Sequence, residues 1–320
     1  VNLLALILAI LFIPFVRRVR PRIQSLGEEA KKQDCTRLAP TIEALALTLL
    51  LAVWLPALLA YVGWRLGLSP VATQFTRSVA YGLVGAAGLW ATLRISRQLV
   101  RQGGIAEAHC AWSDQAAHAL WRDLRWLTVV TVPAVFVIFV FEMRGEDLWR
   151  ESVGRLAFAI SMVAVGVFNY LALRSGGPLA EVMRGRNRRR PWVWRAVQLS
   201  SLVIPLVLIA AALRGFYWTA LQVGARLHFN LAFVFLLVIG LQLAARCSLI
   251  GQRRAAIAYE ALEERPATPA PTMEVSRMMI GAGLLLAILA TFAIWADLLP
   301  AARILQQVCL LYTSPSPRDL

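Results

Sequence analysis

Long apolar runs separated by short polar connections make up most of this chain. A helix of about 20 apolar residues crosses the hydrocarbon core of a bilayer, and eight runs approach or exceed that length. They are Val1–Val16, Thr41–Gly63, a run within Pro70–Leu93, Leu124–Phe141, Val153–Leu173, Ala196–Leu213, Leu227–Ala245 and Met279–Leu299. The pattern predicts an all-α fold, a polytopic membrane helix bundle with about eight transmembrane helices.

The two ends of the chain bear on where the domain begins and stops. Val1–Val16 would form a helix of about 24 Å, shorter than the hydrocarbon core. No charged region precedes it and no small-residue cleavage site follows, so we interpret it as the cut end of a span rather than a signal peptide. We therefore expect one accessory transmembrane helical domain at residues 1–310, truncated at both ends, followed by a tail at 311–320.

Basic residues alternate in number from one connection to the next. Lys and Arg number 7 in 17–40, 2 in 64–78, 5 in 94–125, 3 in 142–155, 7 in 174–195, 2 in 214–226 and 5 in 246–278, with 2 more after the eighth run. The two sides thus carry 24 and 9 basic residues. Because Lys and Arg are retained on the cytoplasmic side, the N-terminal end is predicted to be periplasmic.

The densest basic block lies at 183–195 and contains six arginines in thirteen residues. Arginines beside apolar runs set the orientation of a membrane protein and contact anionic headgroups. A nucleic-acid patch is the alternative, but such patches belong to soluble domains. We predict a role at the membrane surface and in topology for Arg184, Arg186, Arg188, Arg189 and Arg190.

Composition supports the membrane assignment. The chain is 59% hydrophobic and only 16% charged, and its mean hydropathy is +0.63. These values depart from those of soluble globular domains. The net charge of +15 therefore indicates topology and lipid contact, so the predicted partners are membrane lipids and no nucleic acid.

Three connections have a character of their own. Residues 105–123 place Ile105, Ala108, Trp112, Ala116 and Ala119 on one face at helical spacing, which predicts a short helix on the inner leaflet surface. Residues 214–222 form an aromatic re-entry at the outer interface. Residues 260–272 contain three prolines and read as a flexible linker.

Glycines recur within the third run. Gly82, Gly85 and Gly88 are spaced three residues apart. Such spacing permits close contact between helices. Chance glycine in an Ala/Gly-rich segment is the other interpretation, and both stay open at this point.

No catalytic, metal or cofactor site stands out. His109, Cys110 and His118 lie close in sequence, but they lack a fourth ligand and the spacing of a zinc site. We interpret them as ordinary residues of an interfacial helix. The polar residues in or beside the spans are expected to make interhelical hydrogen bonds and caps; they are Glu43, Asn169, Gln198, Asn230, Gln242 and Asp297. The sequence therefore predicts a protein that is not an enzyme.

Four motifs resemble a known family. They are Gly103–His109, Trp121–Trp126 before a proline-containing span, Gly215–Gln222 and Ile294–Pro300. In this order they resemble the inner-membrane region of the large mechanosensitive channels of the MscS superfamily, of the MscK and MscM type. The resemblance runs to about Cys309, and the tail at 311–320 departs from it, so we interpret the tail as non-native.

The resemblance implies an architecture and a role. Such channels place additional membrane helices before a core whose last helix lines the pore, and they assemble as heptamers. This chain would be the accessory region of such a channel in a bacterial inner membrane. It would couple bilayer tension to a pore domain that lies beyond these residues, so no pore-lining residue is assigned.

Two other classes of membrane protein are alternatives to a channel region. A secondary transporter or lipid-handling membrane protein would hold its site between helices, with paired acids near the middle of the membrane. A membrane-bound enzyme would need a cluster of His, Asp or Glu at one interface. The sequence has neither feature.

Overall fold

The computed structural model describes residues 2–31, 38–110, 112–145, 147–174, 177–179, 191–261 and 272–296, and in these ranges all regular structure is helical. The all-α prediction is therefore confirmed. The main helices are α1 (Asn2–Lys31), α2 (Ala39–Gly67), α3 (Gln74–Leu99), α5 (Asp114–Arg144), α7 (Arg155–Leu173), α9 (Pro191–Leu213), α10 (Tyr217–Ala261) and α11 (Thr272–Trp295). Three short elements join them: α4 (Ile105–Ala108), α6 (Asp147–Trp149) and the π-helical turn η1 (Arg150–Gly154).

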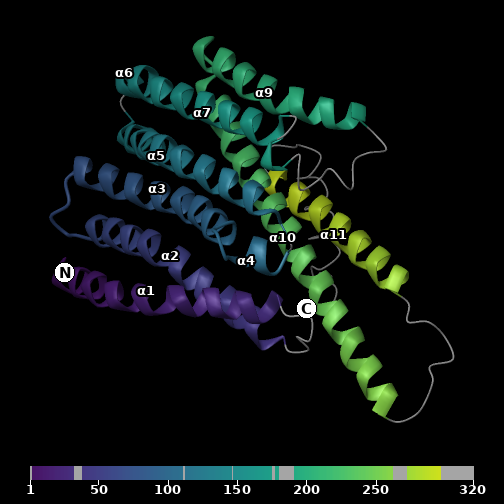
Figure 1. Cartoon of the computed structure of the whole chain (residues 1–320). Coiled ribbons are helices and arrows are strands. Elements are labelled where there is room, and N and C mark those ends of the chain that lie inside the picture. Colours follow the sequence, from purple (N-terminus) through teal and green to yellow (C-terminus); the bar gives the residue numbers. More distant parts are fainter. Residues whose placement is uncertain are drawn as a thin grey trace, which may run out of the picture.

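The helices from α1 to α9 follow one another as antiparallel neighbours. Each packs on the next long helix in the chain, and the contacts of α2 with α3 and of α3 with α5 are the most extensive. Helix α10 runs obliquely past this row, and α11 pairs with it (Figure 1). We call the end of the bundle that holds α4 the α4 end, and the end that holds α6 the α6 end.

Six of these helices are long and apolar enough to cross a membrane. These candidate spans are Ala39–Gly67, Gln74–Leu99, Asp114–Arg144, Arg150–Leu173, Trp194–Leu213 and Tyr217–Gln252. The predicted first span lies in α1, and the predicted eighth overlaps a shorter apolar stretch of α11, Gly281–Trp295. The described residues therefore form a polytopic membrane helix bundle.

The predicted surface helix at 105–123 is wrong. Helix α4 ends at Ala108, and α5 begins afresh at Asp114. The break arises because Ser113 is the N-cap of α5: its side chain accepts a hydrogen bond from the Ala116 backbone. The apolar face of this segment does not lie on a membrane surface, since Ile105 and Trp112 are buried inside the bundle.

The two other notable connections differ in how far they are described. The aromatic segment is a tight turn at Arg214–Phe216, where Gly215 has a φ of 97°, followed directly by the start of α10. Tyr217 then packs edge-on against Phe158 of α7, with ring centroids 6.0 Å apart. The proline-rich linker lies almost entirely outside the described residues.

Two of the three glycines in α3 allow close contact with α5. A Cβ atom on Gly82 would lie 2.5 Å from Val140, and one on Gly85 would lie 2.5 Å from the Phe139 ring. Gly88 has nothing within 4 Å of such an atom. The close-contact interpretation is confirmed for the first two glycines, whereas Gly88 does not take part.

Candidate functional site

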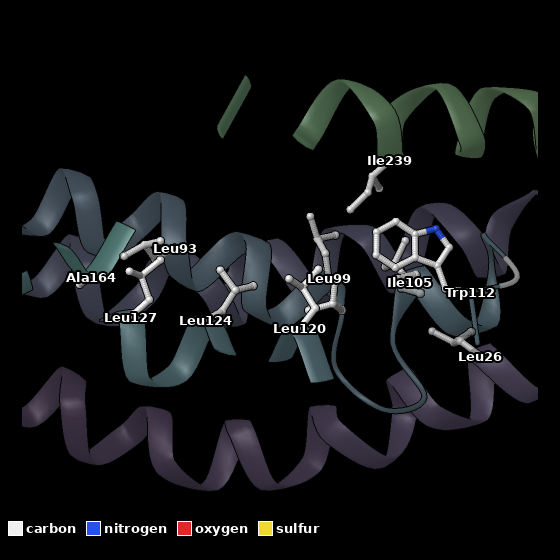
Figure 2. Packing of buried hydrophobic residues seen from close by; sticks show 13 residues of the cluster. Leu26, Leu93, Leu99, Ile105, Trp112, Leu120, Leu124, Leu127, Ala164 and Ile239 are labelled. Atoms are coloured by element: carbon white, nitrogen blue, oxygen red, sulfur yellow. The ribbon is translucent and has the colours of Figure 1, made fainter. Parts of the chain in front are cut away.

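The largest buried cluster joins seven helices and extends from the α4 end into the bundle. It gathers apolar side chains from α1, α2, α3, α4, α5, α7 and α10, and part of it surrounds the chain break that follows α4. Figure 2 shows Leu99, Ile105 and Trp112 side by side, with Ile239 of α10 facing them and Leu26 of α1 beyond. We call this set of five residues the α4 junction. It connects the N-terminal row of helices to α10.

Arg246 of α10 makes the polar part of this connection. Its guanidinium donates to the backbone oxygen of Ala30 at 2.5 Å, of Ala108 at 3.2 Å and of His109 at 3.5 Å. Ala30 and Ala108 stand in the last turns of α1 and α4, where helix carbonyls lack partners in their own helix. A cation is also favourable at the negative end of a helix dipole. One side chain thus caps two helices and ties both to α10.

Two side-chain hydrogen bonds support the same connection. The Trp112 indole donates to Gln242 of α10 at 2.7 Å. Thr41 of α2 and the His109 ring share a hydrogen bond of 3.1 Å. Burial, and to a smaller extent the charge of Arg246, lowers the pKa of His109 to about 4. His109 is therefore neutral at physiological pH and acts in packing and hydrogen bonding.

The three residues weighed as metal ligands do not come together. His109 faces Thr41, while His118 is exposed and stacks on Trp121 at 6.3 Å. Burial raises the pKa of Cys110 to about 12, although the charge of Arg246 opposes this shift. In the part of the chain that the structure describes, no group of three or more His, Cys, Asp or Glu residues could hold a metal ion.

The arginines singled out from the sequence lie outside the described residues, so their predicted role stays a prediction. These are Arg184, Arg186, Arg188, Arg189 and Arg190. Arg195 follows them on α9 and is exposed. Helix α7, which precedes the block in sequence, ends at the α4 end, and α9, which follows it, begins there.

Most of the polar residues predicted to bridge helices do so. Asn230 of α10 accepts from Thr291 of α11 at 3.1 Å. Asn169 of α7 donates to the Ser201 backbone of α9 at 3.5 Å. Glu43 of α2 pairs with Arg22 of α1 at 2.8 Å. The interhelical interpretation is confirmed for these residues and for Gln242, and Asp297 lies outside the described residues.

Helix α10 carries a second arginine at its other end. Arg226 donates to the Ile294 backbone of α11 at 3.1 Å and to the Gln222 side chain at 2.8 Å. Arg226 and Arg246 are twenty residues apart, which is about 30 Å along an α-helix. This length equals the thickness of a typical hydrocarbon core. The two arginines therefore bracket the apolar part of α10 with a backbone anchor at each end.

An apolar cavity of about 320 Å³ lies among α7, α9 and α10. Its wall includes Met162 and Asn169 of α7, Pro205 of α9, and His228 and Phe235 of α10. Trp112 of the α4 junction also reaches it. The cavity and the junction are therefore parts of one region where α10 meets the other helices.

Sequence reasoning found the acceptor Gln242 but missed the donor Trp112 and the central role of Arg246. In the sequence, Arg246 lies at the start of a basic connection, where its charge supports only the prediction of topology. A signal was present: it is the first charge after the apolar run at Leu227–Ala245, one residue beyond a predicted span end. Its partners, however, are backbone carbonyls about 140 and 216 residues away in sequence, and those carry no side-chain pattern.

The sequence of this bundle matches the model of a known family. The model of the family described as "Mechanosensitive ion channel inner membrane domain 1" matches residues 1–275. The chain therefore belongs to this family and is the membrane region of a multi-pass inner-membrane protein. The resemblance drawn from four short motifs is confirmed.

One characterised relative gives a more particular likeness. The chain is 26% identical over 231 residues to the miniconductance mechanosensitive channel MscM of Escherichia coli (strain K12). This similarity covers 71% of the chain and 20% of the relative, so the chain spans about a fifth of that channel's length. No solved structure matches the chain significantly.

Proposed function

We propose that this chain is the accessory membrane region of a large mechanosensitive channel and couples bilayer tension to a pore domain outside these residues. The observation that carries the proposal is the α4 junction, where Arg246 ties α10 to the ends of α1 and α4. Through it, a displacement of the N-terminal helices would be transmitted to α10. Tension favours whichever state occupies more area in the membrane plane, so such a connection is what coupling requires.

Lipid exposure of the outer helices supports the same role. Helices α9, α10 and α11 leave many large apolar side chains uncovered, among them Leu199, Val207, Phe229, Leu284 and Leu289. The apolar cavity among α7, α9 and α10 offers room for part of a lipid chain. Lipid can therefore contact a large area of α9, α10 and α11, and the α4 junction connects α10 to the N-terminal helices.

The orientation and assembly are part of the proposal. The basic asymmetry supports a cytoplasmic α4 end and a periplasmic N-terminal end. Val71, which is 86% exposed in the α2–α3 turn, offers a probe for the α6 end. In a background where the four native cysteines are alanine, an impermeant thiol reagent should label Val71→Cys in intact spheroplasts and spare Gln115→Cys. The reverse labelling would invert the orientation. A homo-heptamer is proposed from the family resemblance.

Patch recording tests the coupling role. Proteoliposomes that hold this chain alone should show no stretch-activated current, while the full-length protein that contains it should conduct under tension. Arg246→Met in the full-length protein should shift the tension at half opening, because the junction loses its three carbonyl bonds. Arg195→Met, at an exposed site of α9, is the control and should leave that tension unchanged.

Three outcomes would contradict the proposal. Stretch-activated current from the chain alone would show that these helices form a pore themselves. An unchanged tension threshold in a folded Arg246→Met channel would remove the junction from the coupling path. Solute uptake by the chain alone would favour the transporter class instead, for which no described residue gives support.

A further inference from the structure

Arginines from three helices gather on one side of the α4 end. Arg94 and Arg97 lie three residues apart near the end of α3, which places them on one helix face, and Arg101 lies two residues beyond the end of this helix. Arg20 of α1 lies close enough to Arg94 and Arg101 for its charge to act on both. Arg125 of α5 stands in the same relation to Arg97. We call these five residues the arginine cluster.

In the described part of the chain, the arginine cluster has no acidic partners. Among the residues that the structure describes, the nearby ion pairs are Arg22 with Glu43 and Arg122 with Asp123, and no carboxylate pairs with a member of the cluster. The buried Nε of Arg94 has no hydrogen-bond partner. Burial, followed by the charges of Arg20 and Arg97, lowers the pKa of Arg101. Like charges held together in this way are stabilised by an anion that pairs with several of them.

Aromatic rings hold two of the arginines in place. The Arg97 guanidinium lies 5.0 Å from the centre of the Trp121 ring, and that of Arg94 lies 5.6 Å from the centre of Trp90. A ring contact occupies the flat face of a guanidinium and leaves the N–H groups at its edge to bind an oxyanion. Tryptophan is also typical of the headgroup level of a membrane. These rings therefore place the cluster at the level where lipid phosphates are expected.

A small polar hollow opens between Arg20 and Arg101. It has a volume of about 20 Å³ and is also lined by Gln24, Gln98 and Gln102. Glu107 stands nearby, and its carboxylate accepts a hydrogen bond from the Gly103 backbone. A hollow of this size takes an oxygen atom or two of an oxyanion, and it is too small for an acyl chain. The amide and guanidinium groups around it supply donors.

We propose that the arginine cluster binds the phosphate group of an anionic phospholipid headgroup. Arg97 of α3 and Arg101 just after it hold the phosphate oxygens, Arg20 closes the site from α1, and Arg125 adds charge from α5. The site thus bridges helices α1, α3 and α5 through a lipid. It differs from the basic block at 184–190, which lies in another connection and outside the described residues.

Lipid titration of the purified full chain in a neutral detergent tests this site. Dioleoyl phosphatidylglycerol should raise the thermal midpoint of helix unfolding in a concentration-dependent way and appear as a bound lipid in native mass spectra. Dioleoyl phosphatidylcholine and inorganic phosphate at matched concentrations are the comparison arms. If the bound phosphate belongs to a lipid, phosphatidylglycerol should raise the thermal midpoint and inorganic phosphate should not. An equal effect of inorganic phosphate would assign the site to a free anion.

The variants separate this site from general charge effects. Arg97→Gln with Arg101→Gln should weaken phosphatidylglycerol binding by about tenfold or more, since two charge-assisted contacts are lost. Arg65→Gln with Arg77→Gln removes the same charge at the α6 end, where Arg65 also lies over a tryptophan at 6.0 Å. This control pair should bind as the unchanged chain does.

Several results would overturn the proposal. They are equal lipid binding by the two double variants, or no preference of the unchanged chain for phosphatidylglycerol over phosphatidylcholine. Helix content before titration shows whether the first double variant has folded. If it has not, Arg101→Gln alone replaces it, because this half-buried residue lies beyond the end of α3. Unaltered binding by that single variant would also count against the site.

Discussion

The bundle has a closely packed part and an open part. In α3, α5 and α7, between 33% and 39% of the most apolar 18-residue window is buried inside the protein, whereas the figure is 17% for α9 and 11% for α10. Glycines allow α3 and α5 to approach closely. The open part is α9 to α11. Helix α9 packs on α7 through apolar side chains, whereas α10 and α11 are also joined to their neighbours by separate polar contacts, notably those of Arg226, Arg246 and Asn230.

This difference shows two ways of joining membrane helices. Lipid is as apolar as the side chains, so burial of apolar surface gives little drive for association, and close van der Waals packing or hydrogen bonds must supply it. The packed part relies mainly on the first means, and α10 and α11 of the open part rely more on the second. A few hydrogen bonds can be remade in a new geometry more easily than an interlocked surface, so movement between states is expected in the open part.

The largest effect is expected from Arg246→Met. The substitution removes three bonds to backbone carbonyls at the α4 junction, and hydrogen bonds to charged groups are worth about 1.5–3 kcal/mol each. We expect the free energy of unfolding to fall by about 3 kcal/mol, less than the sum of three such bonds, because the bonds to Ala108 and His109 are long at 3.2 and 3.5 Å. Titration with sodium dodecyl sulfate in mixed micelles, followed by far-UV circular dichroism, measures this change.

Arg195→Met is the matched control for that substitution, because Arg195 is exposed on the neighbouring open helix α9. Its effect should be within about 0.5 kcal/mol of zero, as for most surface changes. Equal effects of the two substitutions would show that α10 is held by packing, and the contrast between the two parts would fail.

An intermediate effect is expected from Gly85→Ala in the packed part. The new Cβ atom would lie 2.5 Å from the Phe139 ring, so α3 and α5 must separate or the ring must shift. Overpacking of this kind costs about 1–3 kcal/mol. Gly88→Ala, three residues along the same helix, has nothing within 4 Å and should be neutral or slightly stabilising. Similar unfolding curves for both alanine variants would mean that the α3–α5 contact is loose.

The smallest effect is expected from Thr291→Val in the open part. It removes the 3.1 Å hydrogen bond to Asn230 while keeping the shape of the side chain. Such bonds between membrane helices average about 0.6 kcal/mol. Thr128→Val is the control, because the Thr128 hydroxyl bonds to Leu124 within its own helix. A loss above about 2 kcal/mol for Thr291→Val alone would show that α11 depends on this bond more than the open packing suggests.

The sequence predicted the helices well because each apolar run is a local signal. The predicted span at Leu227–Ala245 is flanked directly by the two anchoring arginines of α10, although the helix itself extends from Tyr217 to Ala261. Helix ends were less predictable, since a helix continues into polar sequence wherever nothing stops it. After α4 ends at Ala108, the Ser113 side chain caps the start of a new helix, α5. The helical spacing of apolar residues continues across this break, so the sequence pattern does not indicate it.

The site was harder to predict than the fold for a physical reason. Trp112 and Arg246 act through partners far away in sequence, and three of those partners are main-chain oxygens. Periodicity reports which face of a helix is apolar, but not which other helix covers it. The sequence therefore indicates correctly that one face of residues 105–116 is apolar. The prediction that lipid covers this face is wrong, because other parts of the protein cover it.

The distance between Arg226 and Arg246 gives α10 a fixed span of about 30 Å between its anchors. When a stretched bilayer becomes thinner, a segment of fixed length is mismatched to it and leans over. A loss of about 3 Å in thickness would require a tilt of about 26° to keep both anchors at the membrane surfaces. The tilt of α10 would then depend on membrane thickness. Because Arg246 bonds to the ends of α1 and α4, a change in this tilt would displace those two helix ends.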